Sequence, residues 1–425
     1  MKVISLYTGA GGLDLGLEAA GFENALAVEM NPVALATLRQ NRDRWGVLLD
    51  QSVHAYIDTK APLRKRAQQL LTEADLRPGD VTLLAGGPPC QPFSKSGYWA
   101  RGDSRRLEDP RAKTLSAYLD VLGTALPEVF LLENVPGLSY SSKNEGLELL
   151  RAQVGHINEV RGVNYSFCVA QLNSAEFGVP QLRNRVFVIG HRDGIEFEFP
   201  TPTHALPPGI DISTGLPKPS NSTPNTLMPA RTVWDAIGLL EVDGESPDLR
   251  PRGKWAPVLA TIPEGVNYLW HTNRGGGLSA LWGWRCRYWS MLLKLAKARP
   301  SWTLTATPGP ATGPFHWENR RLATAELAAL QTFPDDYEIV GSNREAHFQL
   351  GNAVPSAMAE ILGLEICRQY FGHNTSAAPT LIPASRGPAP APATPATAET
   401  LPAEILALVR DYEDHCGVGL GQPEP

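Results

Sequence analysis

One cysteine, Cys90, follows an apolar run, two glycines and two prolines in the stretch VTLLAGGPPCQPFSKSG (81–97). The glycines permit a tight turn, and each proline fixes a backbone torsion and stiffens the chain ahead of the thiol. A cysteine placed after such a strand lies at the carboxyl edge of a sheet, where ligands of open α/β folds bind. An isolated cysteine is more often an idle thiol, so the groups that accompany Cys90 decide whether it acts as a nucleophile.

Three further side chains could assist a thiolate. Glu133 follows the apolar strand VFLL (129–132), and a half-buried carboxyl after such a run tends toward a raised pKa and holds a proton. Arg183 and Arg185 alternate in QLRNR, so in an extended segment both point to one face. An unperturbed thiol titrates near ~8.5, and a neighbouring cation favours its ionised form.

The amino-terminal residues predict the element that would position a cofactor beside these groups. KVISLY (2–7) is predicted to be a strand, and TGAGGLDLG a glycine turn followed by the start of a helix. ALAVEMN (25–31) is predicted to be a second strand that ends near the acid Glu29. This order is typical of a βαβ unit that binds an adenosine-containing cofactor. The glycines that would let the backbone approach the ligand are Gly9, Gly11 and Gly12, and Glu29 could accept hydrogen bonds from ribose hydroxyls. The spacing is not G-x-G-x-x-G, which disfavours a dinucleotide.

Strand and helix patterns alternate to about residue 190, which predicts a doubly wound, mostly parallel α/β sheet. The chain of 425 residues is 43% hydrophobic and has no apolar run of 18 residues, so we expect no membrane span. Its five cysteines are odd in number and far apart, which argues against disulfides or a metal cluster. We therefore expect a cytoplasmic protein without a metal.

Residues 250–299 differ from the rest of the chain. They hold nine basic residues against the single acid Glu264, a net charge of +8 in a protein whose total is −6, and five of the ten tryptophans. A basic, aromatic-rich segment on an acidic chain is the footprint of a phosphate-contacting surface.

Seven segments together resemble the motifs of the DNA (cytosine-5) methyltransferases, in the order and approximate spacing of that family. They are SLYTGAGGLDLG, VEMN, GGPPCQPFSKSG, LLENVPGL, QLRNRVFVIG, RRLATAELAALQTFPDDY and QLGNAVPSAMAEIL, and they span most of residues 1–372. The resemblance implies a Rossmann-like class I S-adenosylmethionine-dependent fold with a smaller inserted target-recognition domain.

The resemblance also implies the catalytic roles. Cys90 would add to carbon 6 of cytosine, which makes carbon 5 nucleophilic toward the methyl group. Glu133 would stabilise the charge that develops at ring nitrogen 3, Arg185 would orient the cytosine and the carboxylate, and Arg183 would assist. The base that removes the carbon-5 proton is not visible in the sequence.

The cofactor residues carried over by the resemblance are spread over several motifs. They are Tyr7, Gly9, Gly11, Gly12, Glu29, Met30, Asp50, Pro88, Leu115, Asn352 and Ala353. Tyr7 stands where many members carry Phe, and Met30 where a large apolar residue covers adenine. The acid that contacts the adenine amino group falls within VLLDQSV (47–53), where Asp50 and Ser52 are alternatives.

Because the target atoms are inaccessible in a stacked duplex, the resemblance implies that the cytosine is flipped out of the DNA. The polar stretch 94–111 reads as a loop that closes over the flipped base. HTNRGGG (271–277) offers an amide and a guanidinium that can read base edges in the major groove. The DNA-binding candidates are Ser94, Arg101, Arg105, Arg106, Asn273, Arg274, Arg285 and Arg287.

The predicted organisation has four parts. Residues 1–238 and 316–372 form the catalytic domain, and residues 239–315 form the target-recognition domain inserted within it. Residues 373–425 are expected to be a disordered Pro/Ala linker that ends in a short helix near 402–415.

The sequence thus predicts an enzyme that methylates carbon 5 of cytosine within a specific sequence of double-stranded DNA. A bacterial enzyme of this kind is most often half of a restriction–modification pair, so a cognate endonuclease is an expected functional partner and a monomer the expected state. Three alternatives remain: a tRNA cytosine-5 methyltransferase, a non-catalytic DNA-binding homologue, and a nucleotide-dependent oxidoreductase. The absence of a compact Cys-Phe-Thr signature disfavours the first, and the intact catalytic residues disfavour the second.

Overall fold

A computed structural model describes residues 1–89, 113–139, 145–206, 227–272, 281, 289–373 and 378–410. Its main feature is a seven-stranded sheet in the order β3-β2-β1-β4-β5-β7-β6. The strands are β1 (Lys2–Leu6), β2 (Glu23–Val28), β3 (Val47–Leu49), β4 (Leu83–Gly86), β5 (Val129–Asn134), β6 (Ser166–Asn173) and β7 (Asn184–His191). The first five are mutually parallel, and β7 runs antiparallel to both of its neighbours. The expected doubly wound, mostly parallel sheet is confirmed.

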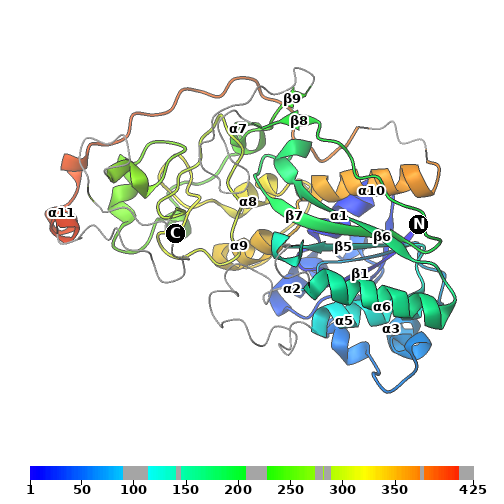
Figure 1. Ribbon diagram of the computed structural model, residues 1–425. Coiled ribbons are helices and arrows are strands. Elements are labelled where there is room, and N and C mark those ends of the chain that lie inside the picture. Colours follow the sequence, from blue (N-terminus) through cyan, green and yellow to red (C-terminus); the bar gives the residue numbers. More distant parts are fainter. Residues whose placement is uncertain are drawn as a thin grey trace, which may run out of the picture.

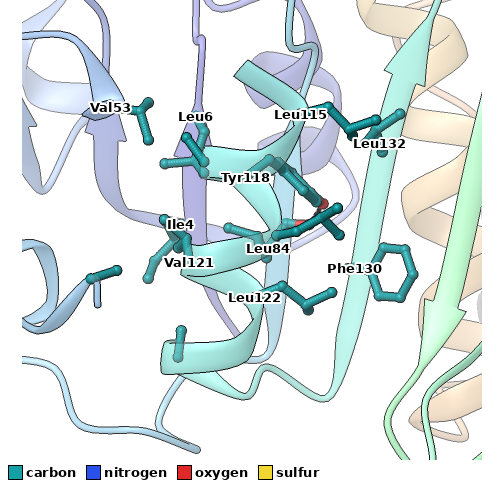
Figure 2. Packing of buried hydrophobic residues seen from close by; sticks show 14 of the residues in the cluster. Ile4, Leu6, Val53, Leu84, Leu115, Tyr118, Val121, Leu122, Phe130 and Leu132 are labelled. Carbon is teal, nitrogen blue, oxygen red and sulfur yellow. Dashed lines mark hydrogen bonds between the residues drawn. The ribbon is translucent and has the colours of Figure 1, made fainter. Parts of the chain in front are cut away.

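Helices cover both faces of this sheet, because successive strand residues point to opposite sides (Figure 1). Ile4, Leu84 and Phe130 face α5 (Lys113–Ala125) and α6 (Glu145–Arg161), and α3 (Gln68–Glu73) joins this layer. Figure 2 shows this packing, in which Tyr118 lies beneath the strands and its hydroxyl donates to the carbonyls of Leu84 and Leu131, each at 3.0 Å.

The opposite face packs against α1 (Gly12–Ala19) and α10 (Ser356–Tyr370). These two helices touch closely because α1 carries glycines: a Cβ added at Gly16 would lie 2.1 Å from the carbonyl oxygen of Ser356. The carboxyl-terminal helix therefore fixes the position of the amino-terminal glycine turn. The helix α2 (Pro32–Gln40) begins at Asn31, whose side-chain oxygen accepts from the amides of Val33 (2.9 Å) and Ala34 (3.2 Å).

A second region, at the left of Figure 1, is built mainly from short elements and irregular chain. Its described helices and strands are β8 (His204–Ala205), β9 (Met228–Pro229), α7 (Val233–Ile237), α8 (Thr324–Leu330), α9 (Asn343–Asn352) and short 3-10 turns at Pro247–Leu249, Ala256–Thr261 and Tyr268–His271. Further 3-10 turns in the first region are Arg42–Arg44, Val53–Tyr56, Leu63–Lys65, Pro136–Ser139 and Ser174–Phe177. Leu295 and Leu304, inside the predicted recognition range, pack with Leu15 and α8, so this region is joined to the first by apolar contacts.

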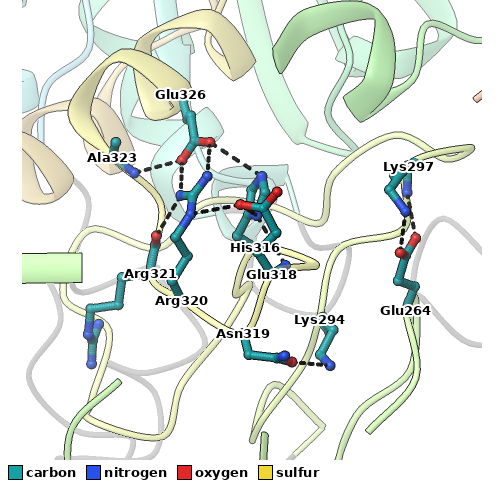
Figure 3. Close-up of polar contacts among 10 residues, drawn as sticks. All are labelled: Glu264, Lys294, Lys297, His316, Glu318, Asn319, Arg320, Arg321, Ala323 and Glu326. Atoms are coloured by element: carbon teal, nitrogen blue, oxygen red, sulfur yellow. Dashed lines mark hydrogen bonds and ion pairs between the residues drawn. The ribbon is translucent and has the colours of Figure 1, made fainter. Parts of the chain in front are cut away.

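An ion-pair network stiffens the return of the chain to α8 (Figure 3). Arg320 donates to both carboxylate oxygens of Glu326, each at 2.8 Å, and Glu326 also accepts from the backbone amide of Ala323 at 2.8 Å. His316 lies against the same carboxylate at 3.3 Å, yet burial lowers its pKa to about 2. His316 is therefore neutral, and the Arg320–Glu326 pair carries the charge.

The carboxyl-terminal tail corrects the prediction of a disordered linker. Residues 378–406 cross the molecule as an extended strap, which ends in α11 (Ala403–Arg410) at the far side of the second region (Figure 1). Glu360 accepts from the amides of Thr380 (2.6 Å) and Leu381 (2.9 Å), and Asp235 accepts from the amide of Arg386 (2.7 Å). The composition predicted extended chain correctly, but it could not show that acids of the folded part bind this backbone.

Among the residues described, no helix is long and apolar enough to cross a membrane, and no cluster of three His, Cys, Asp or Glu side chains could hold a metal.

Candidate active site

A pocket of about 580 Å³ opens at the carboxyl ends of β1, β2, β4 and β5. This edge of a parallel sheet is where ligands of open α/β folds bind. Ten of the predicted site residues line it: Tyr7, Gly9, Gly12, Glu29, Met30, Pro88, Glu133, Arg185, Asn352 and Ala353. Residues from six separate segments of the sequence thus meet in one cavity.

The glycine turn between β1 and α1 forms one wall. Gly9 has a φ of +60°, which a side chain would strain, and a Cβ at Gly12 would lie 2.3 Å from the carbonyl oxygen of Val354. Tyr7 also has a positive φ (59°), and its hydroxyl donates to the carbonyl of Thr114 at 2.9 Å. That bond turns the ring, rather than the hydroxyl, toward the cavity as an aromatic wall.

Gly11 has a different role from the one predicted. It caps α1 with a φ of +87° and is not among the residues that line the pocket. A Cβ there would lie 2.8 Å from the Trp45 ring. Gly11 therefore shapes the turn and its packing.

Glu29 is held rigidly at the end of β2. Its Oε2 accepts from the amide of Gly9 at 2.7 Å, and its Oε1 accepts from the amides of Met30 (2.8 Å) and Asn31 (2.7 Å). A carboxylate has about four acceptor sites, so one position remains for a ligand hydroxyl. Met30 beside it is 63% exposed, an apolar side chain left uncovered at the rim.

Two of the predicted cofactor residues lie elsewhere. Asp50 pairs with Arg39 on the surface at 2.8 Å, and Ser52, the alternative, lines the pocket. Leu115 is buried in the core beneath the sheet (Figure 2), while its neighbour Thr114 lines the pocket. Both corrections have the same physical cause: a motif match resolves position only to within a residue or two, and the local backbone decides which of these side chains faces the pocket.

Glu133 and Arg185 form the polar pair of the pocket. Glu133 is almost fully buried at the end of β5, and the Arg185 Nε contacts its Oε1 at 2.8 Å. Burial raises the pKa of Glu133, and the charges of Arg185 and Arg183 oppose that rise without cancelling it. Oε2 lies on the other side, where a Cβ at Gly87 would come within 3.0 Å of it. One oxygen is thus oriented by a cation, and the carboxyl favours its protonated form.

Arg183 is not in the pocket. It is fully buried, and its guanidinium donates to the carbonyls of Leu304 (3.2 Å) and Gly351 (2.8 Å). It joins the beginning of β7 to α9 and to the 301–306 segment. Its predicted assistance to catalysis is therefore limited to its charge near Glu133 and to holding these elements together.

The chain that leads to the predicted nucleophile is fixed on both sides. The Asn134 amide donates to the carbonyl of Pro88 at 3.3 Å, and the Thr114 hydroxyl donates to that of Pro89 at 3.2 Å. Both prolines line the pocket. Cys90 follows directly, outside the described residues, as do the DNA-binding candidates Ser94, Arg101, Arg105, Arg106, Asn273, Arg274, Arg285 and Arg287.

A second groove, of about 930 Å³, continues from the pocket and was not foreseen from the sequence. The two cavities share Ala306, Thr307 and Phe348. Three arginines line the groove (Arg252, Arg321 and Arg344) with the acids Asp248 and Glu345, and with His347, whose pKa burial lowers to about 4. Of these arginines, only Arg252 lies in the basic segment 250–299. Arg321 and Arg344 come from segments of ordinary composition, which is why the sequence did not point to this groove.

Two lysines of the basic segment 250–299 form buried contacts within the protein instead. Lys297 pairs with Glu264 at 2.5 Å, and the Lys294 ammonium donates to Asn319 Oδ1 at 2.6 Å (Figure 3). Burial lowers the pKa of Lys294 to about 8. The net charge of +8 therefore overstates the positive charge that this segment offers to a phosphate backbone.

The chain is similar to proteins of known family. The sequence model of the family described as C-5 cytosine-specific DNA methylase matches residues 1–241 and 271–368. The chain is 37% identical to type II methyltransferase M.SacI of Streptomyces achromogenes over 91% of this chain and 97% of that protein. It is also 37% identical to type II methyltransferase M.AquIA of Picosynechococcus sp., over 56% of this chain and 88% of that one.

Among solved structures, the fold is similar to a putative DNA modification methyltransferase encoded within an E. coli prophage, with a TM-score of 0.56. The match covers 87% of this chain and 99% of that one at 18% identity, so it supports the fold alone.

Proposed function

This chain belongs to the C-5 cytosine-specific DNA methylase family, and on that premise we propose that it modifies one specific sequence of double-stranded DNA through a covalent adduct of Cys90 with cytosine. The enzyme transfers a methyl group from S-adenosylmethionine to carbon 5 of cytosine in DNA. The observation that carries the mechanistic proposal is the buried Glu133–Arg185 pair, which lies in the same pocket as the prolines that precede Cys90.

The pocket fits the cofactor. Its volume of about 580 Å³ is within the usual range for ligands of that size. The glycine turn leaves backbone bare on one wall, and Glu29 keeps an acceptor for a ribose hydroxyl. Exposed Met30 can cover a flat aromatic base. When bound, S-adenosylmethionine supplies an electrophilic methyl group on a sulfonium.

The protein's own groups prepare the cytosine. The Cys90 thiolate forms a bond to carbon 6, and the electron pair displaced from the ring moves toward nitrogen 3. Burial raises the pKa of Glu133, which favours its protonated form, and in this mechanism the protonated carboxyl donates to nitrogen 3. The ring then carries an electron-rich carbon 5, which takes the methyl group. Loss of the carbon-5 proton to a base expels the thiolate, and return of the nitrogen-3 proton to the Glu133 carboxylate restores neutral, aromatic 5-methylcytosine.

We further propose that residues 239–315 recognise the DNA and that the duplex lies along the groove shared with the cofactor pocket. Support comes from Arg252 of the recognition range and from Arg321 and Arg344 of the following chain, which all line this groove. Asn273 and Arg274 are the proposed readers of base edges.

Transfer of radiolabel tests the proposal. Purified protein is incubated with S-adenosylmethionine tritiated in the methyl group and with either plasmid DNA or tRNA. Label is expected in DNA, and Cys90→Ser is expected to abolish it while the variant keeps the melting temperature of the parent. Label confined to tRNA would overturn the DNA specificity, and undiminished turnover by Cys90→Ser would remove this residue from the nucleophile role.

A place in a restriction–modification pair is proposed from the names of the relatives, which are type II methyltransferases. Bisulfite sequencing of a plasmid recovered from cells that express the protein should then show methylcytosine in a single short sequence. Methylation scattered without sequence context would contradict this proposal.

A further inference from the structure

One carboxyl group of the pocket has no role in the mechanism above. Asp14, the third residue of α1, lines the cavity and is fully buried. Among the residues that the structure describes, neither of its carboxylate oxygens has a hydrogen-bond partner. The Ser5 hydroxyl, which shares a hydrogen bond with the Thr8 hydroxyl at 3.0 Å, lies near enough to lower the pKa of Asp14 but does not offset its burial. A buried carboxyl without a partner is costly, which marks Asp14 as a candidate for contact with a ligand.

The other acids of the pocket are already bonded. Glu29 accepts three backbone amides, and Glu133 is paired with Arg185. Among the described acids that line the pocket, Asp14 is thus the one whose two carboxylate oxygens both lack a hydrogen-bond partner. Asp14 is also held in place, because α1 packs closely against the Val354 and Ser356 carbonyls at Gly12 and Gly16.

The cofactor brings a matching group. S-adenosylmethionine carries an α-ammonium at the end of its methionine part, and an ammonium that leaves water needs an anionic acceptor. Glu29 and Met30, at the end of β2, suit ribose and adenine, whereas Asp14 is on the helix that follows the glycine turn. We propose that the Asp14 carboxylate is the acceptor for the α-ammonium of the cofactor. This inference rests on the proposed function of the pocket as the cofactor site.

The proposal has a consequence for pH. Burial raises the pKa of Asp14 to about 7 in the free protein, and the nearby Glu18 carboxylate on the same helix raises it further. Ser5 on β1 and the Asp14 amide oppose that rise. Tyr337, the remaining titratable group that faces it, has its own pKa raised by burial and is neutral. An ammonium at Asp14 stabilises the ionised form, so binding releases a proton wherever the free carboxyl is protonated.

The size of the effect follows from linkage. With a pKa of about 7, Asp14 is about half ionised at pH 7 and about one-thirtieth ionised at pH 5.5. Affinity for a ligand with the α-ammonium should therefore fall about fifteenfold between these pH values. The ligand's own amino group, with a pKa near ~8, stays protonated throughout this range.

Titration calorimetry with two ligands tests this. S-adenosylhomocysteine keeps the α-ammonium, and 5′-methylthioadenosine lacks the entire amino-acid part. S-adenosylhomocysteine should bind more weakly at pH 5.5 than at pH 7, and its binding should release a proton. Proton release is measured by repeating the titration in buffers of different ionisation enthalpy. 5′-Methylthioadenosine should bind with the same affinity at both pH values.

Asp14→Asn, which keeps the shape and removes the charge, should bind S-adenosylhomocysteine at least tenfold more weakly at pH 7 and without the pH dependence. Glu18→Gln is the matched control, since it removes a carboxylate one turn away that does not line the pocket and should leave the pH dependence in place. If Asp14→Asn does not fold, proton release by the parent protein decides the matter alone.

Equal pH profiles for the two ligands, or an unchanged profile in Asp14→Asn, would overturn the role of Asp14 and leave the cofactor site intact. Failure of the protein to bind either ligand would instead contradict the proposed function of the pocket.

Discussion

The chemistry of this site depends on how one carboxyl group is held. Glu133 has Arg185 against one oxygen and the bare backbone of Gly87 beside the other. Its surroundings are apolar enough that burial outweighs the cation and raises its pKa. In the proposed mechanism, this arrangement supplies a proton donor and an orienting cation at the same place, which either residue alone would not do.

Replacing Glu133 by Gln should lower kcat by about 10²–10⁴-fold, because the amide keeps the shape but cannot give a proton to nitrogen 3. The KM for the cofactor should not change. In the parent enzyme, the protonated form of Glu133 is lost as pH rises through its raised pKa, so kcat should fall on the alkaline side. A pH profile of kcat for both proteins checks this. An alkaline fall that persists unchanged in Glu133→Gln would assign it to another group.

Single residues also show where sequence reasoning was limited. Residue types and spacing predicted that Glu29, Glu133 and Arg185 lie together, and all three line the pocket, because each is near the end or the beginning of a strand at the ligand edge of the sheet. They did not separate Asp50 from Ser52, or Leu115 from Thr114, since the direction of a side chain depends on the local turn of the backbone. Asp14 could not be identified at all, because an unpartnered oxygen is a property of packing and not of composition.

At the scale of elements, the contact between α1 and α10 positions the glycine turn. The strands that begin the chain were predicted nearly as they occur, because alternating burial and glycine punctuation are local signals. The antiparallel direction of β7 was not predicted. It depends on the short Ser174–Phe177 turn and on pairing with β5 and β6, and such pairing is a tertiary contact that local sequence patterns do not show.

Gly16→Ala should destabilise the protein by about 2–3 kcal/mol, because the new Cβ would lie 2.1 Å from the Ser356 carbonyl oxygen. Gly155→Ala is the matched control in α6: a Cβ there has no atom within 4 Å, and alanine should stabilise the helix by about 0.5–1 kcal/mol. Urea unfolding measures both. Similar effects from the two substitutions would contradict the packing described for α1 and α10.

At the scale of the whole molecule, the two regions are joined by more than the chain that passes between them. The strap bonds to Glu360 on α10 and Asp235 on α7, and its end places Leu401 and Ile405 in an apolar cluster with Val258 and Ile262. The tail therefore spans both sides of the molecule. Its Pro/Ala composition gave no sign of this, because the acids that hold it lie far away in the sequence.

Ile405→Asp should release this end of the strap and cost about 2–4 kcal/mol, since it puts a charge into a buried apolar site. Ala403→Asp, on the exposed side of the same helix, should cost little. Limited proteolysis of residues 378–406 and thermal unfolding would report the difference. Equal protection of the strap in both variants would show that the apolar cluster does not hold it.

The charge distribution predicts how the molecule meets DNA. Arg252→Gln in the groove should weaken binding to all duplexes alike and reduce the slope of log affinity against log salt by about 0.9, the value for one lost phosphate contact. Lys60→Gln, an exposed position that does not line the groove, should leave the slope unchanged. Fluorescence anisotropy over a salt series measures it, and an identical slope for all three proteins would place the DNA elsewhere.

The most direct test of the central claim is to trap the bond between protein and base. A duplex whose cytosines are replaced by 5-fluorocytosine is incubated with the protein and S-adenosylmethionine, digested, and analysed by mass spectrometry. Because fluorine cannot leave as a proton does, the account predicts a stable adduct between carbon 6 of the base and the sulfur of Cys90, methylated at carbon 5. An adduct on another residue, or none from a preparation that methylates ordinary DNA, would contradict it.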